Sequence, residues 1–383
     1  MAERHLSRER GEGDASGARS ASGGRSAPGE RLNVLIVGTL GGGGIHRYVD
    51  EQYERLDERL CATVYDMFSD PKGEGAAWFL RSFLLSVWAA LRFPFRRPPD
   101  VVHVHTSHRY SFYRASFYVL YAARIWDRPV VLHVHGSSFD EFVRTDSRLL
   151  AASQSLVFGA TDRVIVLSDY WEDVLADRVD ASKLAVLPNA VDPTEYDPEF
   201  DVDPPHVVFV SNLVERKGVR ELVAAVEALD EAVADDYRVS IAGDGPLRDR
   251  VEDLEARVDA VDYLGYVSEE RKRRLLSEGS VFVLPAYAEG LPIAMLEGMA
   301  GGNAVVSTGV GSIPEVIDDD NGVLVEPRDA AALADALIDL VGDPDRADAM
   351  SRANRRLVEA HYSWDVASDE LHRLYAEEAE TAA

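Results

Sequence analysis

The chain has 383 residues, enough for two domains that each bury a core of their own. Apolar residues make up 46% of it, as expected of a folded globular protein. The 67 Asp and Glu residues outnumber the 40 Lys and Arg residues, and the net charge of −27 argues against a general nucleic-acid binder.

The first 30 residues are rich in Gly, Ser, Ala and Arg and contain no apolar segment, which predicts a disordered tail and not a secretory signal. No uninterrupted apolar run of about 18 residues follows, so the sequence predicts no transmembrane helix. We therefore expect a cytoplasmic protein. The single cysteine, Cys61, excludes an internal disulfide and a cysteine-based metal cluster, and its strand-like surroundings predict a buried thiol.

From Leu32 onward, short runs rich in Val and Ile alternate with longer helical runs. This alternation predicts parallel strands covered by helices on both faces. Six strands are expected in the first half of the chain: Asn33–Val37, Thr63–Met67, Val101–His105, Val130–His135, Arg163–Leu167 and Leu184–Leu187. Six more are expected in the second half: Val207–Ser211, Arg238–Ala242, Ala260–Tyr263, Val281–Leu284, Ala304–Ser307 and Val323–Val325.

A proline-rich, acidic stretch over residues 193–206 separates the two sets of strands and predicts a linker. The fold class is therefore α/β, with two doubly wound, Rossmann-like domains over residues 31–192 and 207–363. Residues 364–383 predict a helix after the last strand, which could cross back onto the first domain. Ligands are expected in the cleft between the domains, beyond the carboxyl ends of the strands.

Four glycines, Gly41 to Gly44, follow the first strand and would let the backbone approach a ligand closely. Asp66 ends the second strand 22 residues later, as in a dinucleotide-binding domain, but the Gly-x-Gly-x-x-Gly pattern fails after Gly44. A nicotinamide loop, a loop facing the interdomain cleft and a structural turn all stay open for this segment.

Histidines recur at the ends of two strands. His133 and His135 point to the same side of their strand, and His135 lies nearer its carboxyl end, where an imidazole could reach the cleft. Metal binding and simple burial are the alternatives for this pair, and no Asp, Glu or Cys lies nearby at metal-ligand spacing. His103 and His105 form a similar pair, for which a structural role is the interpretation.

Arg216 and Lys217 directly precede a predicted helix over Gly218–Leu229. The chain has only four lysines (Lys72, Lys183, Lys217 and Lys272), so a lysine at this point is notable. Two cations and a helix N-terminus could neutralise the charge of a departing diphosphate. A solvated basic pair is the structural alternative.

Glu289 and Glu297 are eight positions apart across a strand-to-helix turn that contains Gly290, Leu291 and Pro292. Glu289 lies in the turn, where it could bind sugar hydroxyls. Glu297 would lie about 7 Å further along the helix, where it could accept hydrogen bonds from a ribose diol. The spacing suits a nucleotide-sugar.

With these segments the chain resembles glycosyltransferase family 4, the retaining group 1 enzymes of GT-B fold. The resemblance covers residues 33 to about 365 and rests on five segments in the family's order: the pair Glu289 and Glu297, Arg216–Gly218, Gly243–Pro246, Gly311–Glu315 and Asn321–Pro327. Gly41–Gly44, His135-Gly136 and Leu187–Asp192 also fit.

The resemblance implies a role for each matching residue. Lys217 would hold the donor diphosphate. Glu289, with the backbone of Gly290 and Leu291, would contact the transferred sugar and phosphate, and Glu297 the ribose. His135 would touch the sugar near the reacting carbon, while Gly42 and Gly43 would close over the diphosphate and the acceptor. Glu289, His135 and Lys217 are the predicted catalytic residues.

The resemblance further implies a transfer from a nucleoside-diphosphate sugar without a metal or another cofactor. The first domain would take a glycan or lipid-linked acceptor, in the synthesis of a surface polysaccharide or glycoconjugate.

One departure concerns Asn212, which stands where the family usually has arginine. One diphosphate cation is therefore missing unless Arg216 replaces it.

Two alternatives to a transferase stay open. One is a non-catalytic partner that binds a nucleotide-sugar, and the other is a nucleotide-sugar epimerase of GT-B fold.

Two aromatic and basic stretches, over residues 76–97 and 111–118, could dock a membrane interface at the cytoplasmic face. Ordinary helices packed on the first sheet are the alternative.

An acidic surface with very few lysines is typical of proteins from a high-salt cytoplasm, so we interpret the charge as a sign of a halophilic habitat.

Overall fold

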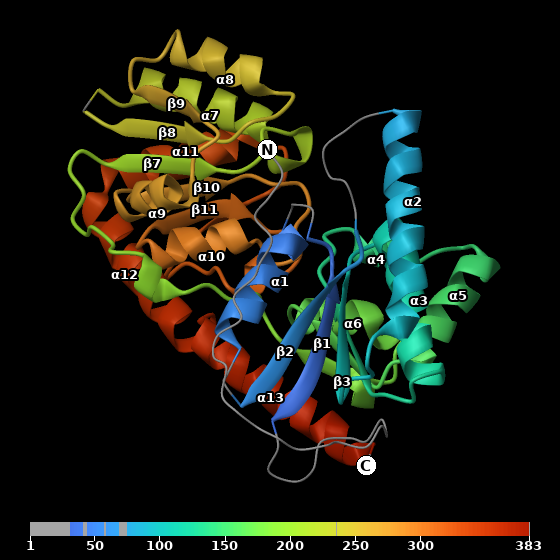
Figure 1. Cartoon of the computed structure of the whole chain (residues 1–383). Helices are drawn as coiled ribbons and strands as arrows, with labels where there is room; N and C mark the ends of the chain where they lie inside the picture. Colours follow the sequence, from blue (N-terminus) through green and yellow to red (C-terminus); the bar gives the residue numbers. More distant parts are fainter. Residues whose placement is uncertain (1–30, 41–43, 57–58, 69–74, 235, 383) are drawn as a thin grey trace, which may run out of the picture.

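The computed structural model describes residues 31–40, 44–56, 59–68, 75–234 and 236–382. They form two six-stranded sheets flanked by helices (Figure 1). The first sheet consists of β1 (Leu32–Gly38), β2 (Leu60–Asp66), β3 (Val101–Thr106), β4 (Val130–Val134), β5 (Arg163–Val166) and β6 (Leu184–Val186). The second consists of β7 (His206–Val210), β8 (Arg238–Ala242), β9 (Val261–Gly265), β10 (Val281–Leu284), β11 (Ala304–Thr308) and β12 (Gly322–Val325).

All the described strand pairs in the two sheets are parallel, and the predicted fold class is confirmed. The central strands are buried along their whole length because Val- and Ile-rich segments are covered on both faces. In the first half the helices are α1 (Gly44–Arg55), α2 (Ala76–Arg92), α3 (Tyr110–Arg124), α4 (Phe139–Val143), α5 (Arg148–Gly159) and α6 (Asp169–Ala176). In the second half they are α7 (Val219–Ala232), α8 (Arg248–Glu255), α9 (Glu269–Ser277), α10 (Ile293–Ala300), α11 (Ala330–Gly342) and α12 (Pro344–His361).

Each sheet has one point at which the strand order reverses. The order is β2-β1-β3-β4-β5-β6 in the first sheet, so the reversal falls between β1 and β3. In the second sheet the order is β12-β11-β10-β7-β8-β9, and the reversal falls between β7 and β10. Doubly wound sheets bind ligands in the crevice at such a switch point. The loops after β7 and β10 are therefore where the second domain should hold its ligand.

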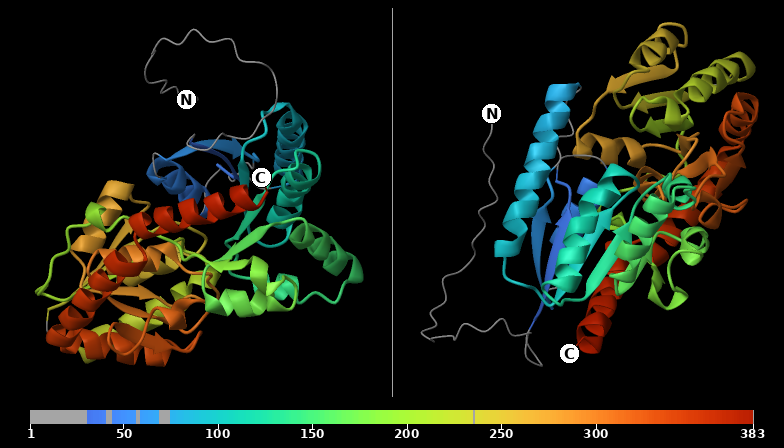
Figure 2. Two further views of the ribbon diagram at one scale, coloured as in Figure 1. Left: turned by 90° about the horizontal axis from the view of Figure 1, so that it is seen from below. Right: turned by 90° about the vertical axis from the view of Figure 1, so that its right-hand side faces the viewer.

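The chain crosses between the domains twice, and the two crossings are hydrogen-bonded to each other. Val191 N donates to the Tyr362 carbonyl (2.9 Å), and Trp364 N donates to the Val191 carbonyl (3.1 Å). Beyond this point the last helix, α13 (Trp364–Thr381), packs on the first domain against α1 and β3 (Figures 1 and 2). Its buried residues Leu371 and Tyr375 share a core cluster with Ile36 of β1.

One prediction was wrong. Cys61 is exposed, because β2 is the edge strand of the first sheet and alternate residues of it point away from the core. The predicted tail over residues 1–30 and the loop glycines Gly42 and Gly43 lie outside the described residues.

Candidate active site

The loops after β7 and β10 bring Lys217 and Glu289 together. Lys217 ends a 3-10 turn (Glu215–Lys217), and its Nζ donates to Glu289 Oε1. Nη1 of Arg216, on the same turn, lies 3.6 Å from that oxygen. The side chains of Lys217 and Glu289 are only 12% and 8% exposed. A buried carboxylate needs such a partner, and the three groups together keep one surplus positive charge that suits an anion.

Two glycines hold these loops in place. Gly218 is left-handed (φ 68°), and a Cβ there would lie 1.9 Å from the Pro285 carbonyl oxygen. Gly311 is also left-handed (φ 57°), and a Cβ there would lie 2.1 Å from the Glu289 carbonyl oxygen. Only glycine, which has no Cβ, fits at both positions. The backbone at Gly218 and at Gly311 can therefore pack closely against the loop after β10, which carries Glu289.

Gly290 and Leu291 connect this turn to the first domain. Asn189, in the crossing segment, donates its amide to the Leu291 carbonyl (2.6 Å). A Cβ added to Gly290 would lie 3.0 Å from Leu167 and 4.0 Å from the Gly136 carbonyl, next to His135. The helix α10 begins directly afterwards at Ile293.

A second contact between the domains lies beside this turn. Glu315 accepts hydrogen bonds from the backbone N–H groups of Asp169 (3.1 Å) and Tyr170 (2.6 Å) at the start of α6. A carboxylate at this position stabilises a helix N-terminus. The motif Gly311–Glu315 therefore fixes how the two domains meet.

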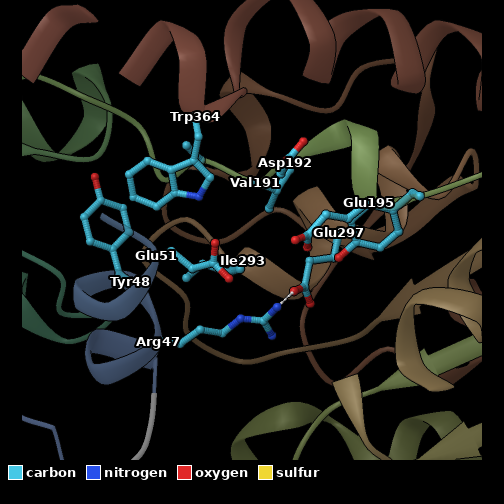
Figure 3. Close-up of a pocket in the computed structure, with 11 residues that line it drawn as sticks. Arg47, Tyr48, Glu51, Val191, Asp192, Glu195, Ile293, Glu297 and Trp364 are labelled. Carbon is cyan, nitrogen blue, oxygen red and sulfur yellow. Dashed lines mark ion pairs between the residues drawn. The ribbon is translucent and has the colours of Figure 1, made fainter. Parts of the chain in front are cut away.

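Glu297 lies one turn into α10 and is 2% exposed. Lys272 of α9 donates to its Oε1 (3.0 Å), and Arg47 of α1 forms an ion pair with the same oxygen. Figure 3 shows Arg47 and Glu297 pointing toward one another in a small pocket between α1, α10 and the crossing segment. Glu289 and Lys217 do not line this pocket, so the two carboxylates occupy separate parts of the site.

The imidazole of His135 faces a cluster of buried aromatic side chains. Its Nε2 lies 2.9 Å from His105 Nδ1, and its ring stacks on His133 at 4.0 Å between centroids. Tyr48 of α1 packs against the His135 ring at 4.8 Å. Burial lowers the pKa of His135 to about 3, although a hydrogen bond with Asn189 opposes this shift. The group is therefore neutral near pH 7.

His103, His105 and His133 form the one group of described residues that could hold a metal ion. Their ring nitrogens lie within 4.8 Å of one another, all three side chains are buried, and burial lowers each pKa, so that the neutral, ligating form prevails. The rings of His103 and His133, however, are nearly parallel, at 13°. Nδ1 of His103 already contacts Gln52 (3.1 Å) and the Tyr375 hydroxyl, so the group also has a structural role.

The remaining predicted donor-binding residue, Asn212, is exposed on the loop after β7, and its carbonyl accepts from Val214 N (2.9 Å). Arg216 donates to the Ala288 carbonyl (2.5 Å), directly beside Glu289. The structure thus gathers Arg216, Lys217 and Glu289 and places Gly290 and Leu291 next to them.

Sequence models of two families match the chain in succession: "Glycosyltransferase Family 4" over residues 42–195 and "Glycosyl transferases group 1" over residues 204–343. The chain belongs to glycosyltransferase family 4, group 1. It is 25% identical to a glycogen synthase of Mycobacterium tuberculosis over 290 residues, which cover 72% of this chain and 68% of that protein. It is 32% identical to the putative colanic acid biosynthesis glycosyltransferase WcaL of Escherichia coli over 235 residues, or 57% of either chain.

Solved structures of other glycosyltransferases share the fold of this one. Sucrose-phosphate synthase from Thermosynechococcus elongatus superimposes with a TM-score of 0.73 at 19% identity, covering 91% of this chain and 99% of that one. Anabaena HepE in complex with UDP superimposes with a TM-score of 0.69 at 15% identity, covering 90% of this chain and 100% of that one. At these identities the likeness establishes the GT-B fold.

Sequence reasoning missed three residues that the structure places at the candidate site. Lys272 is one of only four lysines, so the argument that singled out Lys217 applied to it equally. Arg47 lies three residues after the glycine-rich segment, and Asn189 lies within a motif that the family resemblance included. In each case the contact partner is distant in the chain, and only the fold reveals it.

The buried histidines predict acid sensitivity. Their folded pKa values lie below the unfolded value of about 6.5, so the unfolded chain binds more protons and stability falls as the pH drops below 6.5 toward 3. Each histidine contributes up to about 1.4 kcal/mol per pH unit. Replacing His133 by Asn should lower the number of protons taken up on unfolding between pH 6 and pH 5 by about one. The unfolding free energy should therefore fall less steeply over that range.

Denaturant unfolding at several pH values measures this slope. His361→Asn, at an exposed histidine on α12, is the control and should keep the wild-type slope. Equal slopes for His133→Asn and the wild type would contradict the prediction.

Proposed function

We propose that the protein transfers a hexosyl group, with retention of configuration, from a nucleoside-diphosphate sugar to a glycan or lipid-linked acceptor. The observation that carries this proposal is the buried pair of Lys217 and Glu289 at the β7–β10 switch point. It joins a cation for the diphosphate to a carboxylate for the sugar, at the place where a doubly wound sheet binds ligands. HepE, of similar fold, was solved with UDP and with UDP-glucose.

The donor would extend along the second domain from the sugar to the ribose. Glu289 would hold sugar hydroxyls, Lys217 and Arg216 the diphosphate, and Glu297 the ribose diol. Arg216 would take the place of the arginine that Asn212 replaces, since its guanidinium already lies 3.6 Å from Glu289 Oε1. On binding, the ribose would compete with Arg47 for the Glu297 carboxylate.

The reaction would proceed on one face of the sugar. The bond from the anomeric carbon to the diphosphate oxygen breaks, the acceptor oxygen bonds to that carbon, and the acceptor proton passes to the leaving oxygen. Lys217 and Arg216 would stabilise the charge that develops on the diphosphate. His135, neutral near pH 7, would have to give up its contact with His105 or with Asn189 in order to hydrogen-bond the sugar.

Two alternatives remain distinguishable from a transferase. A non-catalytic partner would bind a nucleotide-sugar and leave it intact with every acceptor. An epimerase would release a free sugar or an altered donor without any acceptor. All three activities would use Lys217, Arg216 and Glu289 to bind the donor, so an assay with and without an acceptor separates them.

We further propose that the enzyme works in a cytoplasm of high salt and builds a surface polysaccharide or glycoconjugate. The net charge of −27 and the scarcity of lysine support the habitat. The relative WcaL, whose name refers to colanic acid biosynthesis, supports the class of product.

Removing either member of the central pair should stop turnover. Glu289→Gln and Lys217→Ala should each lower kcat by about 100-fold, because each removes charge stabilisation that matters most in the transition state. The double variant should lose little more than the worse single one, since the two groups act together. Rates of sugar transfer in a defined donor–acceptor assay measure this.

Glu270→Gln is the matched control, because Glu270 pairs with Arg274 on the exposed face of α9. Its rate should equal that of the wild type. Unchanged transfer in both Glu289→Gln and Lys217→Ala would refute the assignment of the site.

Replacing Glu297 by Gln should weaken donor binding. A ribose contact is made equally in the ground state and the transition state, so the donor KM should rise about tenfold while kcat changes little. Glu269→Gln is the control, since Glu269 shares Arg47 (2.9 Å) and Lys272 (2.7 Å) with Glu297 but is half exposed. An equal rise in KM for both variants would show that the ion pairs matter and the ribose contact does not.

Turnover should not need a divalent cation, because Lys217 and Arg216 would neutralise the diphosphate. Dialysis against EDTA should leave kcat unchanged, and added Mg²⁺ or Mn²⁺ should restore nothing. A loss of activity that either cation reverses would contradict metal independence.

A further inference from the structure

The helix α2 exposes large apolar side chains along most of its length. Phe79, Leu80, Phe83, Leu84, Trp88 and Leu91, here called the α2 patch, are between 45% and 67% exposed. They follow a spacing of three and four residues and so form one continuous stripe. Phe95, just beyond the helix, is 89% exposed. The helix stands on the outer side of the first domain, away from the second domain (Figures 1 and 2).

The amphipathic pattern of α2 is inverted relative to that of a core helix. Its buried residues are Ser82, Ser86 and Ala89. Ser86 Oγ donates to the Phe68 carbonyl (2.9 Å), and Tyr65 OH donates to the Ala89 carbonyl, so hydrogen bonds hold this narrow face. The helix thus buries small and polar side chains and leaves most of its leucines and phenylalanines exposed. Exposed apolar stripes of this kind mark a binding surface.

The charge around the α2 patch is opposite to that of the rest of the protein. Residues 76–99 contain four arginines and no Asp or Glu, in a chain whose net charge is −27. Arg92, Arg96 and Arg97 are all exposed at the end of the helix, and Arg92 lies over the Trp88 ring at 4.4 Å. An apolar stripe flanked by arginines and tryptophan matches the interface of a bilayer that carries anionic head groups.

The segment Ala76–Phe95 is also long and apolar enough to cross a membrane, by length and composition. The contacts of Ser86 and Ala89 tie the helix to the domain, however, and a spanning helix would have to break them. Lying in the plane of the interface keeps both sets of contacts.

We propose that α2 docks this glycosyltransferase on the surface of an anionic lipid bilayer, with the α2 patch in the acyl region and the arginines at the head groups. The docking follows from the exposed surface of α2 alone, whatever reaction the enzyme catalyses. That the enzyme meets a lipid-linked acceptor there rests on the proposed function.

Flotation with vesicles tests the docking without any transfer reaction. The full-length protein is mixed with vesicles of phosphatidylglycerol and phosphatidylcholine in equal amounts, or of phosphatidylcholine alone. We expect the wild type to float with the anionic vesicles. The combined variant Phe83→Ser, Leu84→Ser, Leu91→Ser should lose at least ten-fold in bound fraction. At a KCl concentration of about 1 M the wild type should still float, because insertion of apolar side chains does not depend on charge. Its preference for vesicles with phosphatidylglycerol should become weaker, because salt screens the arginines.

Two surface residues outside the patch provide the matched control. Tyr266→Ser with Val366→Ser removes comparable exposed apolar area, at 85% and 43% exposure, and should float like the wild type. Quenching of tryptophan fluorescence by brominated lipid, compared between the wild type and Trp88→Phe, reports insertion of the patch without destabilising the helix. We expect Trp88 to account for most of the quenching.

Donor binding separates this proposal from the proposed function. The patch variant should bind a nucleoside diphosphate as the wild type does. A wild type that floats with neither type of vesicle, a patch variant that floats equally well, or a patch that proves to join two copies in sedimentation would each overturn the docking. A wild type that floats with anionic vesicles but transfers no sugar in the donor–acceptor assay would overturn the proposed function alone.

Discussion

The ion pair between Lys217 and Glu289 connects the two loops on either side of the β7–β10 switch point, and the arrangement of the site follows from it. Both groups are nearly buried, so each needs the other in the absence of a ligand. Such a pair contributes little to stability when its desolvation is counted, and its value lies in holding a carboxylate and an ammonium where a donor would need them. Gly218 and Gly311 make this possible, because a side chain at either position would collide with the neighbouring backbone.

The second domain carries the residues proposed to bind the donor, and contacts between the domains set how it meets the first domain. Asn189 bonds the turn that follows Glu289, Glu315 binds the start of α6, and Arg47 reaches Glu297 from α1. These three contacts come from different elements and all lie close to the predicted donor path. The contacts that join the two domains therefore also hold residues of the candidate site.

Sequence alone predicted the strands and the switch-point residues because both leave local signals. Val-rich runs mark buried parallel strands, and Lys217, Glu289 and Glu297 stand in short motifs at strand-to-helix turns. It could not predict partners far apart in the chain, such as Lys272 and Arg47 on Glu297, or the direction in which His135 points. The burial of Cys61 was predicted wrongly, since composition does not distinguish an edge strand from a central one.

The central claim is that the Lys217–Glu289 switch point binds the diphosphate of a nucleotide-sugar. Thermal unfolding of the protein with each of the common nucleoside diphosphates, and with the matching nucleosides, tests it most directly. At a ligand concentration about 100 times its Kd, one diphosphate should stabilise the fold by about 2.7 kcal/mol. The matching nucleoside should do far less, and Lys217→Ala should remove most of the gain. A protein whose stability no diphosphate raises, or a Lys217→Ala variant that responds like the wild type, would contradict the account.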